Sequence, residues 1–220
     1  MIEAIYIDHM GSDLSVVNAA RVSFGKKSEW MPRIHYGEEL VLKPKDAKLI
    51  RYLAKHNHKS PFNHTFVTFH VKAPIFVARQ LQKHEYMPWN EVSRRYVDDE
   101  PEFYVPDVWR GRAQDKKQGS DGEIHDIRPS VARNMVEDCR QNYNYLLAKG
   151  VSPEQARMVL PQSMMTEWYW SGTLFAFAKM CGLRLKEDTQ AETRIVAEKI
   201  EDVMMKLFPV SWEALRMYEE

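Results

Sequence analysis

The alternation of apolar and polar residues along the chain predicts three strands. Residues 65–71 alternate with a period of two and are rich in β-branched and aromatic side chains, which is typical of a half-buried strand. Residues 2–7 alternate more weakly, and residues 166–170 form a short run with several aromatic side chains. We expect a strand in each of these three segments.

Apolar residues at helical spacing predict helices around these strands. Pro44 suits the first turn of a helix over residues 44–56, because its fixed φ is already helical. Pro74 opens a second helix of about ten residues, which ends before Pro88. Further helices are expected over residues 13–22, 131–149, 174–182 (closed by Gly182) and 188–207, with a short helix that Ser152 caps and Pro153 begins.

The order of these elements indicates the fold class. Strands and helices do not alternate strictly, so the pattern predicts an α+β fold rather than a doubly wound parallel sheet. A chain of 220 residues fits one domain, which we expect to cover residues 1–220. Two polar segments, at about 25–43 and 111–129, are expected to be surface loops.

Composition and charge narrow the class of partner and compartment. The chain has 31 Lys and Arg residues and 31 Asp and Glu residues, so its formal net charge is zero. Because no excess of positive charge would attract nucleic acid or a membrane, we expect neither as a partner. The first residues lack the basic and apolar regions of a signal peptide, and the near-apolar stretch 168–178 is too short to span a bilayer. Cys139 and Cys181 form no disulfide framework or metal quartet. A cytoplasmic, reduced protein is therefore expected.

Five of the eight histidines lie between His56 and His84. A metal site built on His56, His58 and His64 is one interpretation, and it would suit a metal-dependent hydrolase of nucleic acids. However, the segment holds no helical His-x-x-x-His pair and no Asp or Cys at ligand spacing, so we assign no metal ligands. The hydrolase stays open as an alternative.

Two neighbouring segments concentrate polar side chains. On a helix, Gln80, Lys83 and His84 share one face, although an ordinary amphipathic helix explains this equally well. After Pro88 an extended backbone would point Glu91, Ser93 and Arg95 to one side. A carboxylate, a hydroxyl and a guanidinium at alternate positions can bind a phosphate and a base, but they also occur on solvated strand edges.

Two arginines, Arg157 and Arg184, stand in apolar sequence. Such an arginine is either a surface residue with a buried stem or an anchor for an anion. The pattern alone does not decide between these interpretations.

Taken together and in order, these motifs resemble the flavin-dependent thymidylate synthases. The resemblance covers nearly the whole chain outside the two polar loops. Each motif alone is unspecific, but the order of all the motifs along the chain is specific. The matching elements are Ala19-Ala20-Arg21-Val22-Ser23, His58-x-Ser60-Pro61-Phe62-x-His64, Ala78-Arg79-Gln80, Asn90-Glu91-x-Ser93-x-Arg95-Tyr96, Ala156-Arg157-x-Val159-Leu160-Pro161, Leu183-Arg184 and Gln190-x-Glu192.

The resemblance implies a fold, an assembly and a reaction. It implies a mainly antiparallel sheet flanked by helices and a homotetramer with active sites at subunit interfaces. The reaction is the reductive methylation of dUMP to dTMP, with methylenetetrahydrofolate as carbon donor and NADPH reducing a bound FAD. This chemistry needs no cysteine nucleophile, because flavin hydride can replace a thiolate in activating the pyrimidine.

The resemblance also assigns residues to each ligand. Arg184 is expected to favour the ionised uracil imide, and Ser93 to bind and polarise the substrate rather than attack it. The residues expected at dUMP are Gln80, Lys83, Glu91, Ser93, Arg95, Arg157 and Arg184. Those expected at FAD are Ser60, Lys83, His84, Glu85, Glu91, Thr173 and Lys179.

The sequence departs from the family at its hallmark Arg-His-Arg, which here reads Lys83-His84-Glu85. Glutamate inverts a charge where the family approaches the flavin phosphates, and lysine loses the planar fork of arginine. Our hypothesis is that Lys179, where relatives carry an uncharged amide, restores the lost positive charge. The departure leaves open a different product, such as hydroxymethyl-dUMP.

Overall fold

The computed structural model describes residues 1–33, 40–114, 119–128 and 130–218. Parts of both predicted polar loops, residues 34–39, 115–118 and 129, therefore lie outside the described residues. Within the described part, four strands form one antiparallel sheet in the order β1-β4-β8-β5. They are β1 (Glu3–Met10), β4 (Phe66–Pro74), β5 (Trp89–Glu91) and β8 (Met165–Thr173), and they confirm the three predicted strands and the α+β fold.

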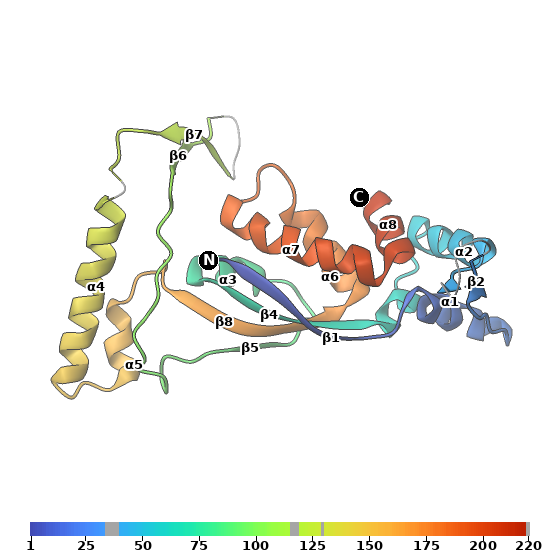
Figure 1. The fold of residues 1–220 in the computed structure, drawn as a ribbon, viewed down its shortest axis with the longest axis horizontal. Coiled ribbons are helices and arrows are strands. Elements are labelled where there is room, and N and C mark those ends of the chain that lie inside the picture. Colours follow the sequence, from blue (N-terminus) through green and yellow to red (C-terminus); the bar gives the residue numbers. More distant parts are fainter. Residues whose placement is uncertain (34–39, 115–118, 129, 219–220) are drawn as a thin grey trace.

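One face of the sheet carries the core (Figure 1). Along β4 every second side chain is fully buried: Val67, Phe69, Val71 and Ala73. Helices pack over this face, because a strand that alternates apolar and polar residues must bury one side. The helices around the sheet are α1 (Asp13–Arg21), α2 (Pro44–Lys55), α3 (Ile75–Leu81), α6 (Leu174–Arg184), α7 (Ala191–Leu207) and α8 (Pro209–Met217).

Aromatic rings fill the centre of this core. Trp170 of β8 meets Phe177 of α6 at 5.4 Å between ring centroids, and Phe177 meets Phe69 of β4 at 5.2 Å. Trp168 stacks on Trp89 of the edge strand β5 at 4.4 Å. These contacts, in offset and edge-to-face geometries, fix α6 and the edge strand to the two central strands.

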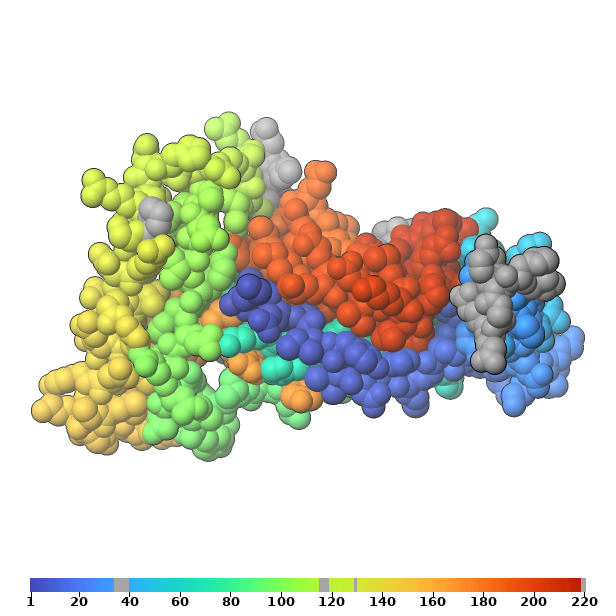
Figure 2. Space-filling view, in the orientation of Figure 1, coloured from blue at the N-terminus to red at the C-terminus, as the bar shows by residue number. Residues whose placement is uncertain are grey.

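An elongated arm projects from one end of the molecule (Figures 1 and 2). It carries α4 (Ser130–Ala148), α5 (Pro153–Ala156), and the hairpin of β6 (Trp109–Arg112) and β7 (Ser120–Ile124). α4 and α5 confirm the predicted helices there, although the Ser152 side chain makes no capping hydrogen bond. The hairpin corrects the prediction of a loop over residues 111–129.

Several predicted helix and strand ends were wrong. α3 ends at Leu81, well before Pro88, so Lys83 and His84 lie in a turn and not on its helical face. α6 runs through Gly182 to Arg184, because the glycine is buried inside the helix rather than ending it. β5 ends at Glu91, and the chain turns over residues 94–96 instead of staying extended.

The helix α8 (Pro209–Met217) was not predicted from the sequence. Its start depends on a distant partner: the carboxylate of Asp13 accepts hydrogen bonds from the backbone N–H groups of Val210 and Ser211 at 3.0 and 2.8 Å. These donors in the first turn have no partner within the helix itself. A cap supplied by α1 leaves no local motif in the sequence.

Candidate active site

A cavity of about 690 Å³ lies beside α6 and is bordered by the turn over residues 83–87; we call it the α6 cavity. Five of the seven residues predicted at FAD line it, together with Arg184. The structure thus brings together Lys83, His84, Glu85, Thr173, Lys179 and Arg184.

Thr173 joins the start of α6 to the segment that carries Asn63. Its hydroxyl donates to Asn63 Oδ1 at 2.8 Å and accepts from the backbone N–H of Ala176 at 3.2 Å, as an N-cap residue does. One helix face then follows, on which Ala176, Lys179 and Leu183 line the cavity. The cavity therefore begins at the positive end of the α6 dipole.

Positive charge dominates the lining of the α6 cavity. Among the residues that the structure describes, its charged side chains are four cations, Lys59, Lys83, Lys179 and Arg184, and one carboxylate, Glu85. Glu85 and Lys179 line the same cavity, as the charge-compensation hypothesis requires. A cavity with this excess of cations suits an anionic ligand.

His84 and Arg184 form a direct pair in the lining of the cavity. Arg184 Nε donates to His84 Nε2 at 3.1 Å, and Arg184 Nη2 donates to the backbone carbonyl of Gln80 at 2.9 Å. Burial, followed by the charges of Arg184 and Lys179, lowers the pKa of His84 from 6.5 to about 4. At neutral pH the ring is uncharged, and since Nε2 accepts from Arg184, the remaining proton sits on Nδ1.

This low pKa predicts a pH-dependent stability. The unfolded chain binds a proton at His84 below about pH 6.5, whereas the folded chain binds it only near pH 4. The free energy of unfolding should therefore fall as the pH drops from 7 towards 4. Urea unfolding at a series of pH values measures this slope, and His84→Gln should reduce it. An unchanged slope in His84→Gln would contradict the assignment.

Gln80 lies next to this pair but points its side chain elsewhere. Its amide donates to Gln190 Oε1, and its Oε1 accepts from the hydroxyl of Thr193 at 3.2 Å. Gln80 thus links α3 to the start of α7, while its backbone carbonyl holds Arg184.

Glu91 does not line the α6 cavity. Its two carboxylate oxygens accept from Thr166 Oγ1 at 2.8 Å and from Trp89 Nε1 at 3.1 Å. Thr166 is buried in β8, so Glu91 is held at the junction of β5 and β8. The structure fixes this carboxylate in place but separates it from the other residues predicted at FAD.

Ser93 and Arg95 meet through the turn rather than along a strand. Arg95 Nε donates to Ser93 Oγ at 3.3 Å, and the guanidinium lies 5.0 Å from the centre of the Tyr96 ring. Arg95 is exposed, and neither residue lines the α6 cavity. The two stay adjacent, but the extended backbone that was predicted to align them with Glu91 is absent.

Arg157 lies in the arm, in the 3-10 turn η3 (Arg157–Val159) that follows α5. It is exposed, and its Nε donates to the backbone carbonyl of Glu154 at 3.2 Å. Of the two interpretations left open for Arg157, the structure supports the surface residue, and the adjacent Met158 is exposed as well.

Ser60 lines a second, larger cavity of about 1040 Å³ between α1 and α2, which we call the α2 cavity. Arg21 and Ser23 of the Ala-Ala-Arg-Val-Ser motif line it as well, and Lys59 belongs to both cavities. Lys59 was not predicted, nor was Asn63. Both stand at the variable positions of His58-x-Ser60-Pro61-Phe62-x-His64, where a motif carries no signal.

Neither cysteine is placed as a nucleophile. Cys181 is fully buried in α6, where its Sγ lies 3.7 Å from the carbonyl oxygen of Ala197 and burial raises the pKa of the thiol. Cys139 lies half-buried on α4.

The described residues show neither a metal site nor a membrane-spanning helix. Over residues 1–33, 40–114, 119–128 and 130–218, no three His, Cys, Asp or Glu side chains lie close enough together to bind a metal ion. In the same ranges no helix is both long and apolar enough to cross a bilayer.

Known proteins match this chain over almost its whole length. Residues 6–210 match the family described as thymidylate synthase complementing protein. The flavin-dependent thymidylate synthase of Thermus thermophilus is 40% identical over 209 residues, which are 94% of this chain and 73% of the relative. That of Thermosipho africanus is 36% identical over 212 residues, 94% of this chain and 88% of the relative.

Solved structures agree with these matches. The UMP/dUMP methylase PolB of Streptomyces cacaoi bound with 5-Br dUMP has a TM-score of 0.83 at 33% identity, over 99% of this chain and 96% of that one. The same enzyme bound with 5-Br UMP has a TM-score of 0.82 at 34% identity, over 99% and 95% of the two chains. The sheet and helices described above thus share the fold of PolB.

Proposed function

The chain belongs to the thymidylate synthase complementing protein family of flavin-dependent thymidylate synthases, and from this membership we propose that it methylates dUMP to dTMP. In this proposal FAD is the bound cofactor, NADPH reduces it, and methylenetetrahydrofolate gives the carbon. The observation that carries the proposal is the α6 cavity, where Lys83, His84 and Glu85 of the altered hallmark line one cationic pocket together with Thr173, Lys179 and Arg184 at and in α6.

The residues of the α6 cavity fit a flavin dinucleotide. Lys83, Lys179 and Lys59 offer positive charge to a diphosphate, and the neutral His84 offers an Nδ1–H donor to an uncharged acceptor. Ser60 extends this surface into the adjoining α2 cavity. When bound, the flavin would supply the hydride, and the protein would supply position, charge and exclusion of water.

Arg184 is the proposed catalytic residue. It is half-buried and fixed by two hydrogen bonds, so its remaining N–H donors are held in place for an anion. A fixed guanidinium stabilises the negative charge that forms on a uracil imide without reorganising during the reaction. Gln80 supports Arg184 through its carbonyl.

Ser93, Arg95 and Arg157 are proposed to bind the nucleotide phosphate and base from outside the α6 cavity. Ser93 Oγ accepts from the backbone and side chain of Arg95, so this pair is better suited to binding than to nucleophilic attack. All three lie beyond that cavity in one chain. We therefore propose that chains associate, as a homotetramer, so that a complete site forms at an interface, with Glu91 beside it.

The proposal also covers the domain and the compartment. We propose that residues 1–220 act as one domain, because one cluster of buried apolar residues joins β4 and β8 to α1, α2, α3, α6, α7 and α8, and Tyr104 at the base of the arm packs against it. The two cysteines are free thiols, which agrees with a reducing cytoplasm.

The decisive experiment combines a spectrum with product analysis. The purified protein with added FAD should show the isoalloxazine absorbance bands after gel filtration. Incubation with dUMP, methylenetetrahydrofolate and NADPH should give a product with the mass of dTMP. A hydroxymethyl product would support the divergent alternative, and UMP as a second substrate would test whether the 2′-hydroxyl is tolerated, as in the structural relative. A colourless, metal-containing protein would instead favour the hydrolase.

A substitution tests charge compensation at the altered hallmark. Lys179→Ala should weaken FAD binding about tenfold, since it removes one charge-assisted contact to a phosphate. Glu85→Gln should tighten binding, because it removes the one carboxylate of the cavity lining. Fluorescence titration of apoprotein with FAD measures both.

The matched control for Lys179→Ala is Lys206→Ala on the exposed side of α7. Equal FAD affinity in the wild type, the control and Lys179→Ala would refute the compensation while leaving the function intact.

A further inference from the structure

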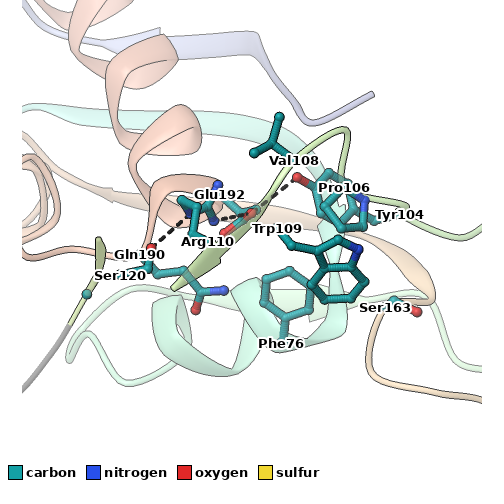
Figure 3. Close-up of a pocket in the computed structure, with 11 residues that line it drawn as sticks. Phe76, Tyr104, Pro106, Val108, Trp109, Arg110, Ser120, Ser163, Gln190 and Glu192 are labelled. Atoms are coloured by element: carbon teal, nitrogen blue, oxygen red, sulfur yellow. Dashed lines mark hydrogen bonds and ion pairs between the residues drawn. The ribbon is translucent and has the colours of Figure 1, made fainter. Parts of the chain in front are cut away.

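A third cavity, of about 470 Å³, lies between the arm and the body, and we call it the hairpin cavity (Figure 3). Its described lining residues are all different from those of the α6 cavity. Its walls are largely apolar and aromatic, with Phe76 and Tyr104 in edge contact at 6.0 Å. The Gln190-x-Glu192 motif lines it, and the proposed reaction gives that motif no task.

Glu192 is a buried, charged group at this cavity. The residue is 3% exposed, and its Oε1 accepts from the Tyr104 hydroxyl at 3.2 Å and from the Arg110 guanidinium. Burial by itself would raise the pKa of the Glu192 carboxyl, but the hydrogen bond from Arg110 and further contacts hold it below its ordinary value. Tyr104, whose pKa burial and the Glu192 charge raise to about 12, stays protonated as the donor.

Two buried polar atoms at this cavity lack partners. Among the described residues neither Glu192 Oε2 nor Trp109 Nε1 has a partner in hydrogen-bond geometry, although the Gln190 side chain lies close enough to the Glu192 carboxyl to help lower its pKa. The first is an acceptor and the second is a donor. Buried polar groups in native structures are usually paired, so two orphans of opposite kind at one cavity call for a ligand that pairs them.

We propose that the hairpin cavity binds an uncharged, planar nitrogen heterocycle that carries an amino or carboxamide group. The amino hydrogen would donate to Glu192 Oε2, and a ring nitrogen or carbonyl would accept from Trp109 Nε1. The aromatic walls suit a flat ring, and the ligand is uncharged because Arg110 already neutralises Glu192. This site is additional to the flavin and dUMP sites.

Ligand-observed NMR on the full-length protein tests the proposal with adenine, cytosine and nicotinamide as separate probes. At least one probe should receive saturable magnetisation transfer from the protein. Trp109→Phe keeps the ring and removes the N–H donor, so it should weaken that probe about fivefold, the effect of one neutral hydrogen bond. The matched control is Trp30→Phe, the same change at a residue outside the cavity lining, which should bind as the wild type does.

A blocking variant separates binding from a purely structural role of the Glu192 contacts. Ser163→Phe should fill the cavity and abolish the signal while circular dichroism stays native, because the Ser163 backbone carbonyl, which accepts from Tyr104 N–H, is unchanged and the Ser163 hydroxyl has no hydrogen bond among the described residues. The proposal is overturned if no probe binds, if Trp109→Phe and Ser163→Phe bind as the wild type does, or if FAD or dUMP displaces the probe. None of these outcomes bears on the flavin spectrum that tests the proposed function.

Discussion

Replacing Arg184 by alanine is expected to lower kcat/KM for dUMP about a thousandfold. Removing a single fixed donor from a preorganised site costs about a hundredfold to a thousandfold in rate, and here a charged fork is lost. The substitution also frees His84 Nε2, which accepts from Arg184 in the folded protein. Steady-state formation of dTMP, followed by mass, measures the loss.

Two further variants make this prediction specific. Arg184→Lys keeps the charge but cannot reach both His84 and the Gln80 carbonyl, so its activity should lie between that of Arg184→Ala and the wild type. Arg51→Ala on α2 breaks an exposed ion pair with Glu213 of α8 and should leave activity unchanged. If Arg184→Ala retained activity within about threefold of wild type, Arg184 could not supply the proposed transition-state charge stabilisation.

The central strands could be predicted because packing and local pattern agree there. β4 lies between two other strands with helices over one face, so its buried positions follow the apolar alternation of the sequence without a break. β1 is an edge strand whose last six residues are exposed, and its alternation is correspondingly weak. Apolar alternation therefore predicts a strand best where one face of that strand is fully buried.

The end of α3 could not be predicted because it depends on contacts across the fold. After Leu81 the chain must turn so that Met87 reaches β8, where its Cε lies 2.9 Å from the position of a Cβ added to Gly172. Tyr86 takes a positive φ of 59° within this turn. Tyrosine gives no sequence signal for that conformation, which tertiary packing imposes here.

The hairpin of the arm shows the same limit. All residues of β7 are exposed, so no apolar pattern marks it. Its position depends on Arg110, which pairs with Glu192, and on Gly119, where an added Cβ would lie 2.8 Å from the carbonyl oxygen of Asp188. These contacts join residues some 70 to 80 positions apart in the chain. The local sequence shows only polar residues and a glycine there, so it does not predict the hairpin.

The candidate site was predictable only as far as one chain contains it. The family motifs identified Lys83, His84, Thr173 and Arg184, and the fold collects these four around one cavity. The same motifs also named Ser93, Arg95 and Arg157, which lie outside it. The order of the motifs identifies candidate ligand-binding residues. It does not predict which of these residues lie together in a single subunit.

Replacing Asp46 by alanine is expected to lower the free energy of unfolding by about 3–5 kcal/mol, the usual cost of breaking a buried ion pair from one side. Asp46 is fully buried in the first turn of α2, where its carboxylate accepts from the Arg21 guanidinium and the Ser28 hydroxyl. The alanine variant leaves the Arg21 cation, itself mostly buried, without its partner. Urea unfolding followed by circular dichroism measures the change.

The same substitution should also weaken FAD binding, because Asp46 orders one wall of the α2 cavity. Ser28 is tied to α1 through Asn18 as well as to Asp46, and the Asp46 carboxylate holds Arg21, which lines the cavity. Asp46→Asn keeps an acceptor for Arg21 and should lose less stability than Asp46→Ala. A stability loss with unchanged FAD affinity would confine Asp46 to folding, and no stability loss would refute the buried pair itself.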